Sequence, residues 1–181
     1  MGLYLGKEKL CSCDELVYTS NSMKMFFDAG GDFYGVTAKS MDGWFDKSDT
    51  ADMTSMSYMF YRCYYLTSVP AMDTSKVTDM DGMFRDCSSL TSVPEMNTGS
   101  VTSMSQMFSN CTKLTEIHMY GMKVSFDISV STKFTREALV EILNNLATIT
   151  SSQTLTMGST NLAKLTDDDK AIATGKGWTL K

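Results

Sequence analysis

The sequence of 181 residues contains few basic residues and no long apolar run, and both absences exclude classes of protein. Sixteen Lys and Arg stand against 21 Asp and Glu, the net charge is -5, and no basic patch appears, so a nucleic-acid partner is not expected. No apolar run approaches the ~18 residues of a membrane span, so membrane insertion is not expected either. The N-terminus lacks the apolar core of a secretion signal, which predicts a chain that is cytoplasmic as made, with virion or cell-surface exposure left open.

What is present is a unit of 24 residues written three times between residues 50 and 120. The copies keep one register and differ mainly at polar and aromatic positions. A single copy is too short to bury its own apolar face, so the copies are expected to stack and share one continuous core. The aligned apolar positions are Phe60, Phe84 and Phe108; Cys63, Cys87 and Cys111; Leu66, Leu90 and Leu114; Met56, Met80 and Met104; and Met59, Met83 and Met107.

The apolar period changes within each unit. In the second copy the apolar residues from Val77 to Cys87 follow a spacing of three and four, which favours a short helix or helical turn. Residues 90–93 then favour a short strand. Pro94 has no N–H group and is expected to end strand pairing at that point.

The aligned sulfur-containing residues allow more than one interpretation. Stacked repeats ~5 Å apart would bring ladder cysteines within disulfide reach, and thiolates or methionines could also hold a soft metal. Because the chain has no secretion signal, and because both residue types fill apolar cores, buried thiols and packed methionines are the favoured prediction. Cys11 and Cys13 lie outside the ladder.

The segment before the repeat, residues 1–49, is predicted to be an N-terminal cap on the stack. Residues 3–5 and 16–19 favour short strands, and the turn signal at 29–32 predicts a hairpin. Residues 41–45 resemble residues 80–84, but Phe45 lies 15 rather than 24 residues before Phe60, which suggests a degenerate entry coil.

The segment after the repeat, residues 121–181, is predicted to be an α/β cap that completes one compact unit. Thr135 and Thr166 are expected to cap two helices, and Gly175 is expected to end the second. The expected strands are residues 124–128, 154–157 and 178–180.

Catalytic residue types are scarce. The single histidine, His118, could form a nucleophile and base pair with Cys111, but the ladder position of Cys111 is explained by packing alone. The acidic run 167–169 could bind a cation, although the positive end of a helix explains it without EF-hand spacing. The glycines within 29–32 are too few to hold a phosphate. No enzymatic activity, cofactor or metal site is expected.

An aromatic and basic group in the first two repeats is the candidate interaction surface. Tyr and Arg are favoured at binding hot spots, whereas the alternative is that these rings pack against the N-terminal segment. Three strands of ~3 residues would offer a sheet face of only ~150 Å², well below the ~800 Å² per partner of a stable interface. Loops, caps or avidity would therefore have to contribute. The group comprises Tyr58, Tyr61, Arg62, Tyr64, Tyr65 and Arg85.

The repeat resembles the BspA-type leucine-rich-repeat surface proteins of bacteria. Their pattern of Val-Thr-x-Met, Met-Phe-x-x-Cys-x-x-Leu-Thr and a Thr-Ser or Asn-Thr turn appears here at residues 77–80, 83–91 and 73–75. The tail from Phe134 to Trp178 resembles the C-terminal cap of some prophage-encoded members. The resemblance implies a curved solenoid that binds proteins or host surfaces without catalysis, and it carries over no set of binding residues.

These observations predict an α/β fold, a short leucine-rich-repeat-like solenoid of 24-residue coils between two atypical caps. The first functional hypothesis is a non-catalytic module that binds a protein or a glycan, phage- or cell-surface-associated and suited to adhesion. The alternative is a structural subunit of a larger virion or surface assembly. An enzyme ranks last, and the oligomeric state is left open.

Overall fold

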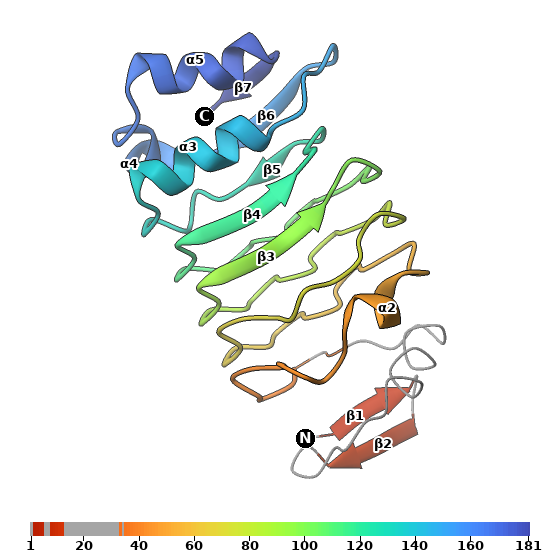
Figure 1. The fold of residues 1–181 in the computed structure, drawn as a ribbon. Helices are drawn as coiled ribbons and strands as arrows, with labels where there is room; N and C mark the ends of the chain where they lie inside the picture. The colour runs from red at the N-terminus through yellow and green to blue at the C-terminus, as the bar shows by residue number, and fades with distance from the viewer. Residues whose placement is uncertain (1, 6–7, 13–32, 34) are drawn as a thin grey trace.

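The computed structural model describes residues 2–5, 8–12, 33 and 35–181. The three copies of the repeat lie one above another along an elongated body, with the C-terminal elements at the far end from the N-terminus (Figure 1). We call residues 50–72 repeat 1, residues 73–96 repeat 2 and residues 97–120 repeat 3. The elements are β1 (Gly2–Leu5), β2 (Glu8–Ser12), α2 (Lys47–Thr50), β3 (Ser92–Asn97), β4 (Glu116–Tyr120), β5 (Phe126–Asp127), α3 (Arg136–Asn145), β6 (Gln153–Thr156), α4 (Gly158–Leu162), α5 (Asp167–Gly175) and β7 (Trp178–Leu180).

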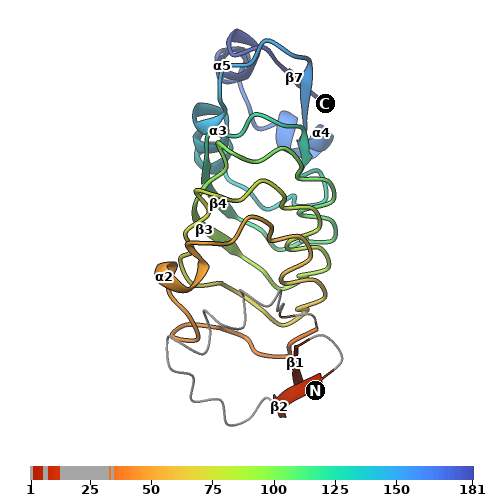
Figure 2. The same cartoon turned by 90° about the vertical axis from the view of Figure 1, so that its right-hand side faces the viewer.

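A ladder of main-chain hydrogen bonds joins each repeat to the next. Met56 N donates to Asp79 O at 2.9 Å, and Met80 N donates to Ser103 O at 3.0 Å, 23 residues further along in both cases. The same step recurs at every second residue, from 56, 58, 60 and 62 in repeat 1 and from 80, 82, 84 and 86 in repeat 2. The side view shows the resulting parallel loops (Figure 2). The ladder satisfies main-chain groups that would otherwise be buried without partners.

Threonines fasten the repeats together elsewhere on the coil. Thr91 donates both its N–H and its hydroxyl to Thr67 O, and Thr115 does the same to Thr91 O. Thr78 and Thr102 repeat the arrangement on a second column. Each of these hydroxyls donates to the carbonyl of the residue 24 positions earlier. These directional bonds fix the register between successive repeats more narrowly than apolar packing does.

A column of phenylalanine rings forms the centre of the core. Phe60, Phe84 and Phe108 stack with ring centroids 5.4 and 6.0 Å apart, and all three are buried. The ladder cysteines are also buried as free thiols, and each Sγ donates to a main-chain carbonyl, as Cys87 does to Phe60 O. The aligned methionines are at most 1% exposed. The predictions of buried thiols in the repeat and of packed methionines are therefore confirmed.

The segment of each repeat that was expected to form a short helix or helical turn consists of a series of tight turns. Met83 N donates to Met80 O and Cys87 N to Phe84 O, three residues back, and no helix is assigned between 77 and 87. Two residues in each repeat take positive φ, for example Gly82 at 58° and Asp86 at 65°, as type II turns require. A helix cannot form because alternate N–H groups are already committed to the neighbouring repeat.

Pro94 does not end strand pairing, which corrects a second expectation. Strand β3 runs through Pro94 to Asn97 and pairs in parallel with β4. The register jumps between Val93 and Met96, where Pro94 and Glu95 lie opposite the single residue His118 of β4. The extra residue lets the strand pass a position with no N–H donor.

Two phenylalanines before repeat 1 pack on the first ring of the column. Phe33 N donates to Met59 O, and the Phe33 ring stacks on Phe60 at 5.5 Å, so Phe33 extends the column. Phe45 packs beside both rings, at 5.6 Å from Phe33. The strand predicted at residues 3–5 is part of β1, which pairs with β2. The strand expected at 16–19 lies outside the described residues, as does the turn of the hairpin expected at 29–32.

The C-terminal segment forms a parallel sheet of β5, β6 and β7. Helix α5 packs beside β7, and α3 packs against β4 and α5. Thr135 caps α3 and Thr166 caps α5, which ends at Gly175, all as expected. Helix α4, which begins at Gly158, was not predicted; the sequence indicated only the preceding strand, at residues 154–157. Lys176 contacts the carbonyls of Leu143, Asn144 and Leu146 at the C-terminal end of α3, a position that favours a cation.

Candidate interaction surface

Four of the six candidate residues come together across repeats 1 and 2. The rings of Tyr58 and Tyr61 meet edge to face at 5.6 Å. The guanidinium carbon of Arg62 lies 5.0 Å from the centroid of the Tyr61 ring, and that of Arg85 lies 5.5 Å from it. Cation–π contacts of this kind hold flexible arginines against a rigid ring. We call Tyr58, Tyr61, Arg62 and Arg85 the tyrosine–arginine cluster.

Polar contacts extend the cluster to repeat 3. Arg85 Nη1 donates to Gln106 Oε1. Arg62 Nε lies 3.8 Å from Asp86 Oδ2, and Asn110 Nδ2 donates to Asp86 Oδ1 at 2.6 Å. Each of these contacts joins one repeat to the next. The cluster is therefore part of a surface that extends over all three repeats.

Tyr64 and Tyr65 lie beyond the cluster on the following turn of repeat 1. They are 46% and 55% exposed, and no ring or cation contact within the described part of the chain joins them to the four residues above. Tyr58 is 41% exposed. The alternative interpretation, packing against the N-terminal segment, concerns residues that lie largely outside the described ranges.

The backbone conformation explains why the cluster can form. Tyr58 and Arg62 have φ of 57° and 59°, a left-handed conformation that is uncommon for side chains other than Gly, Asn and Asp. In repeat 2 the equivalent of Tyr58 is Gly82, and a Cβ there would lie 2.5 Å from Tyr58 Cε1. The Tyr58 ring therefore occupies space that a side chain at position 82 would fill.

The histidine and the ladder cysteine do not form a catalytic pair. His118 Nδ1 lies 2.7 Å from Glu141 Oε1 on α3, and Nε2 lies 3.6 Å from Glu116 Oε2. The hydrogen bond to Glu141 raises the pKa of His118 above its ordinary value. Cys111 donates to Phe84 O instead, and burial raises its pKa to about 12, so it carries a thiol rather than a thiolate at neutral pH.

The contact of His118 with Glu141 was not predictable from local sequence. Glu141 and Asn145 on α3, with Glu95 and Tyr120 on the strands, line a shallow cavity of about 460 Å³ beside His118. Three carboxylates therefore lie near a single histidine: Glu116 on the same strand, Glu95 on β3, and Glu141, which only the docking of α3 against β4 brings there.

The acidic run at 167–169 has a structural role in the folded chain. Asp169 accepts from Thr166 N and holds Arg136 with two hydrogen bonds of 2.7 and 2.8 Å. Arg136 keeps the pKa of Asp169 below its ordinary value. Within the described ranges no group of three or more His, Cys, Asp or Glu is placed to bind a metal ion, and no helix there is long and apolar enough to cross a membrane.

Comparison with protein families gives one match. A family described as "Mycoplasma protein of unknown function, DUF285" matches residues 21–141, about two thirds of the chain. The chain belongs to this family. Comparison with curated proteins and with solved structures finds no match.

The DUF285 match contains all six candidate residues and extends past the repeat at both ends. It covers the coil that contributes Phe33 to the aromatic column and reaches into α3, where Glu141 is its last residue. The elements from β6 to β7 lie outside it. Within the described residues, the DUF285 segment therefore comprises the three repeats, the coil before them, β5 and the first part of α3.

Proposed function

We propose that this DUF285 chain is a non-catalytic binding module that recognises a protein or a glycan through the tyrosine–arginine cluster and the neighbouring Tyr64 and Tyr65. We further propose that its stack is a short leucine-rich-repeat-like solenoid of the BspA type. Its place of action is a virion or cell surface.

The observation that carries the proposal is the fixed position of Tyr61 between two arginines. The guanidinium carbons of Arg62 and Arg85 lie 5.0 and 5.5 Å from the centroid of the Tyr61 ring. Tyr and Arg dominate binding hot spots because they offer large contact areas and several hydrogen-bond donors. Side chains that are ordered before binding lose less conformational entropy when a partner arrives.

The extension of the surface over three repeats also supports a binding role. The aromatic and basic side chains lie on the turns of repeats 1 and 2, and polar contacts continue onto repeat 3. A stable interface takes roughly 800 Å² on each partner. The small β3–β4 sheet does not offer this area, and the side chains on the turns provide further contact area.

The chemistry of the buried groups favours binding over catalysis. Burial raises the pKa of Cys87 and of Cys111, so neither thiol is activated as a nucleophile. The hydrogen-bond partner of His118 is Glu141, and that of the Cys111 thiol is Phe84 O, so His118 is not paired with a thiol as a general base would be.

The test is binding of the purified chain to a glycan array and a protein array. Tyr61→Ala/Tyr64→Ala should lose at least tenfold in affinity for any ligand found, since hot-spot truncations cost about 2 kcal/mol or more. Tyr120→Ala is the matched control, because Tyr120 is also 41% exposed but lies on β4. Blank arrays, or equal loss in the control, would contradict the proposal.

Light scattering at micromolar concentration addresses the alternative role as a structural subunit. A monomer that binds a ligand on the arrays agrees with the proposal. Self-assembly that is lost in Tyr61→Ala/Tyr64→Ala would show that the same surface joins copies of this chain, and the proposed ligand binding would then be wrong.

A further inference from the structure

The ladder that joins the repeats stops after repeat 3. Met56 and Met80 each donate to the residue 23 positions later, as do Tyr58 and Gly82. The next steps would start from Met104 and Gln106 and end at residues 127 and 129. No main-chain hydrogen bond of that kind is present within the described residues.

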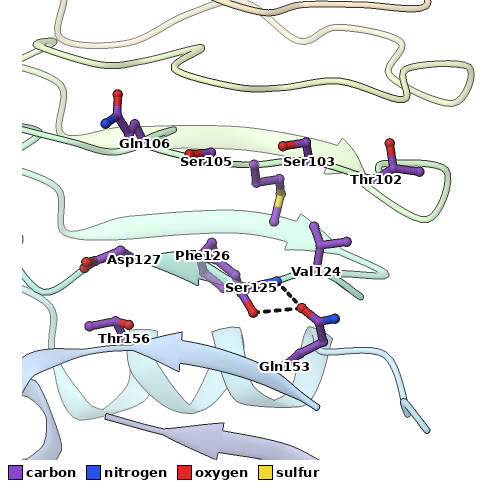
Figure 3. Close-up of a pocket in the computed structure, with 11 residues that line it drawn as sticks. Thr102, Ser103, Ser105, Gln106, Val124, Ser125, Phe126, Asp127, Gln153 and Thr156 are labelled. Carbon is purple, nitrogen blue, oxygen red and sulfur yellow. Dashed lines mark hydrogen bonds between the residues drawn. The ribbon is translucent and has the colours of Figure 1, made fainter. Parts of the chain in front are cut away.

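A cleft of about 400 Å³ occupies the place of the missing step. Ser103 and Ser105 of repeat 3 lie along one wall, and Ser125, Phe126 and Asp127 lie along the other (Figure 3). The volume falls within the range of ~300–1,000 Å³ that is typical of ligand sites.

The N–H groups of Met104 and Gln106 face this cleft. Their equivalents in repeat 2, Met80 N and Gly82 N, both donate in the direction of the following repeat, at 3.0 and 2.8 Å. In repeat 3 the same direction leads to the cleft, which both residues line. The cleft therefore offers two main-chain donors, two residues apart, like an unpaired edge of a sheet.

The opposite wall offers main-chain groups as well. Strand β5 pairs with β6 through Phe126, and Ile128 N donates to Thr156 O at 2.8 Å. Alternate residues of a strand direct their main-chain groups to opposite edges. The N–H and C=O groups of Asp127 therefore point away from β6, toward repeat 3.

The side chains of the cleft indicate what it would bind. Asp127 is the one charged residue among the eleven that line it, and it is exposed. Phe126 is the one aromatic residue among them and is only 5% exposed, so no ring is open for stacking against a sugar. Hydroxyl and amide groups make up most of the remainder, and a neutral or basic ligand fits this lining better than an anion does.

We propose that this cleft binds an extended peptide that carries a basic side chain. The carbonyl groups of the peptide accept hydrogen bonds from Met104 N and Gln106 N, as in β-strand addition, and its Lys or Arg lies beside Asp127. Gln106 is shared with the tyrosine–arginine cluster, because its side chain accepts from Arg85. The proposed peptide uses the main-chain N–H group of Gln106, so the site does not depend on the side chains of the cluster.

The free chain gives the first test. In amide hydrogen exchange, Met104 and Gln106 should exchange faster than Met80 and Gly82, because only the latter donate to another repeat. Equal protection at all four amides would overturn the proposal before any ligand is tried.

The second test uses a library of random heptapeptides, with and without a central Lys or Arg, on the immobilised full chain. Peptides with the basic residue should be selected, and their titration should shift and protect the amides of Met104 and Gln106. A library without binders would overturn the proposal. So would binders that leave these amides unchanged, or glycans that shift them when no peptide does.

Variants separate the cleft from the rest of the surface. Asp127→Asn should weaken basic peptides about two- to fivefold, the loss expected for an accessible ion pair, while Asp168→Asn on α5, also exposed, should not. Ser105→Trp should block the cleft and abolish binding, with folding checked by circular dichroism. Tyr61→Ala/Tyr64→Ala should leave peptide binding intact, so failure of the proposed function and failure of this site are distinguishable.

Discussion

The phenyl rings of Phe60 and Phe84 stack nearly parallel, with their centroids 5.4 Å apart and 3° between their planes. The two residues are 24 positions apart and belong to different repeats. Phe33 and Phe108 extend the same column on either side. The stability of each repeat therefore depends on rings that its neighbours supply.

Phe84→Ala should lower the free energy of unfolding by about 3–5 kcal/mol, because it leaves a cavity in the middle of the ring column. Phe84 is fully buried between Phe60 and Phe108. Urea unfolding measures the loss. A change below ~1 kcal/mol would show that the column does not hold the stack together.

Leu90→Ala should cost about 2–5 kcal/mol, since Leu90 is fully buried in repeat 2. The adjacent Ser89 is only partly buried, and Ser89→Ala should change stability by no more than about 0.5 kcal/mol. Urea melts of the two variants provide the comparison. Equal losses would contradict the assignment of these neighbours to the inside and the outside of the stack.

Gly82→Ala should destabilise the chain by about 1–2 kcal/mol, because Gly82 has a left-handed backbone conformation that disfavours a Cβ. A further loss is expected because the new Cβ would lie 2.5 Å from Cε1 of Tyr58. In a Tyr58→Ala background only the backbone cost should remain. Gly175→Ala is the control, because a Cβ there meets no atom within 4 Å. Thermal melts of the four variants give the coupling between Gly82 and Tyr58, and zero coupling would contradict the close contact.

The three ladder thiols should not react with a thiol-specific disulfide reagent until the chain unfolds. Burial raises the pKa of Cys111 to about 12 and that of Cys87 still further, and the reagent needs an accessible thiolate. The measurement uses Cys11→Ser/Cys13→Ser, in which only the ladder cysteines remain. Three thiols should react in denaturant, and rapid reaction of the native variant would contradict their burial.

His118 should make stability depend on pH. Its pKa is raised in the folded chain, chiefly by the hydrogen bond to Glu141. The stability that protonated His118 contributes is therefore fully present below its pKa of ~6.5 in the unfolded chain. It is lost as the pH rises through the higher pKa of the folded chain. Urea melts should show a larger gap between wild type and His118→Gln at pH 6 than at pH 8.5. Glu141→Gln should remove most of that difference, and a gap that grows with pH would contradict the ion pair.

Several features of the fold follow from local pattern alone. The aligned Phe, Cys and Met residues predicted a shared core because they recur every 24 positions. The caps at Thr135 and Thr166 were predictable because a capping hydroxyl acts within three residues of its own position. The tyrosine–arginine cluster was predictable as a group, but not the exclusion of Tyr64 and Tyr65 from its ring contacts.

Other features depend on contacts that no local pattern contains. The spacing of Val77 to Cys87 favoured a helix, yet main-chain bonds to repeat 3 replace the bonds a helix would need. Phe45 resembles Phe84 in its sequence context, yet Phe33 occupies the ring column. Glu141 meets His118 only through the docking of α3, and the cleft beside Asp127 lies between repeat 3 and β5, which pairs with β6.

The sequence by itself determined which residues stack on which, because a strict period repeats the same chemistry at the same place in every unit. Tertiary structure alone decided how the chain turns between those positions and where the stack opens toward its C-terminal segment. The physical reason is that a main-chain N–H group can be committed to a neighbouring repeat or left for a ligand. That choice depends on the strand beside it in space rather than on the side chains beside it in sequence.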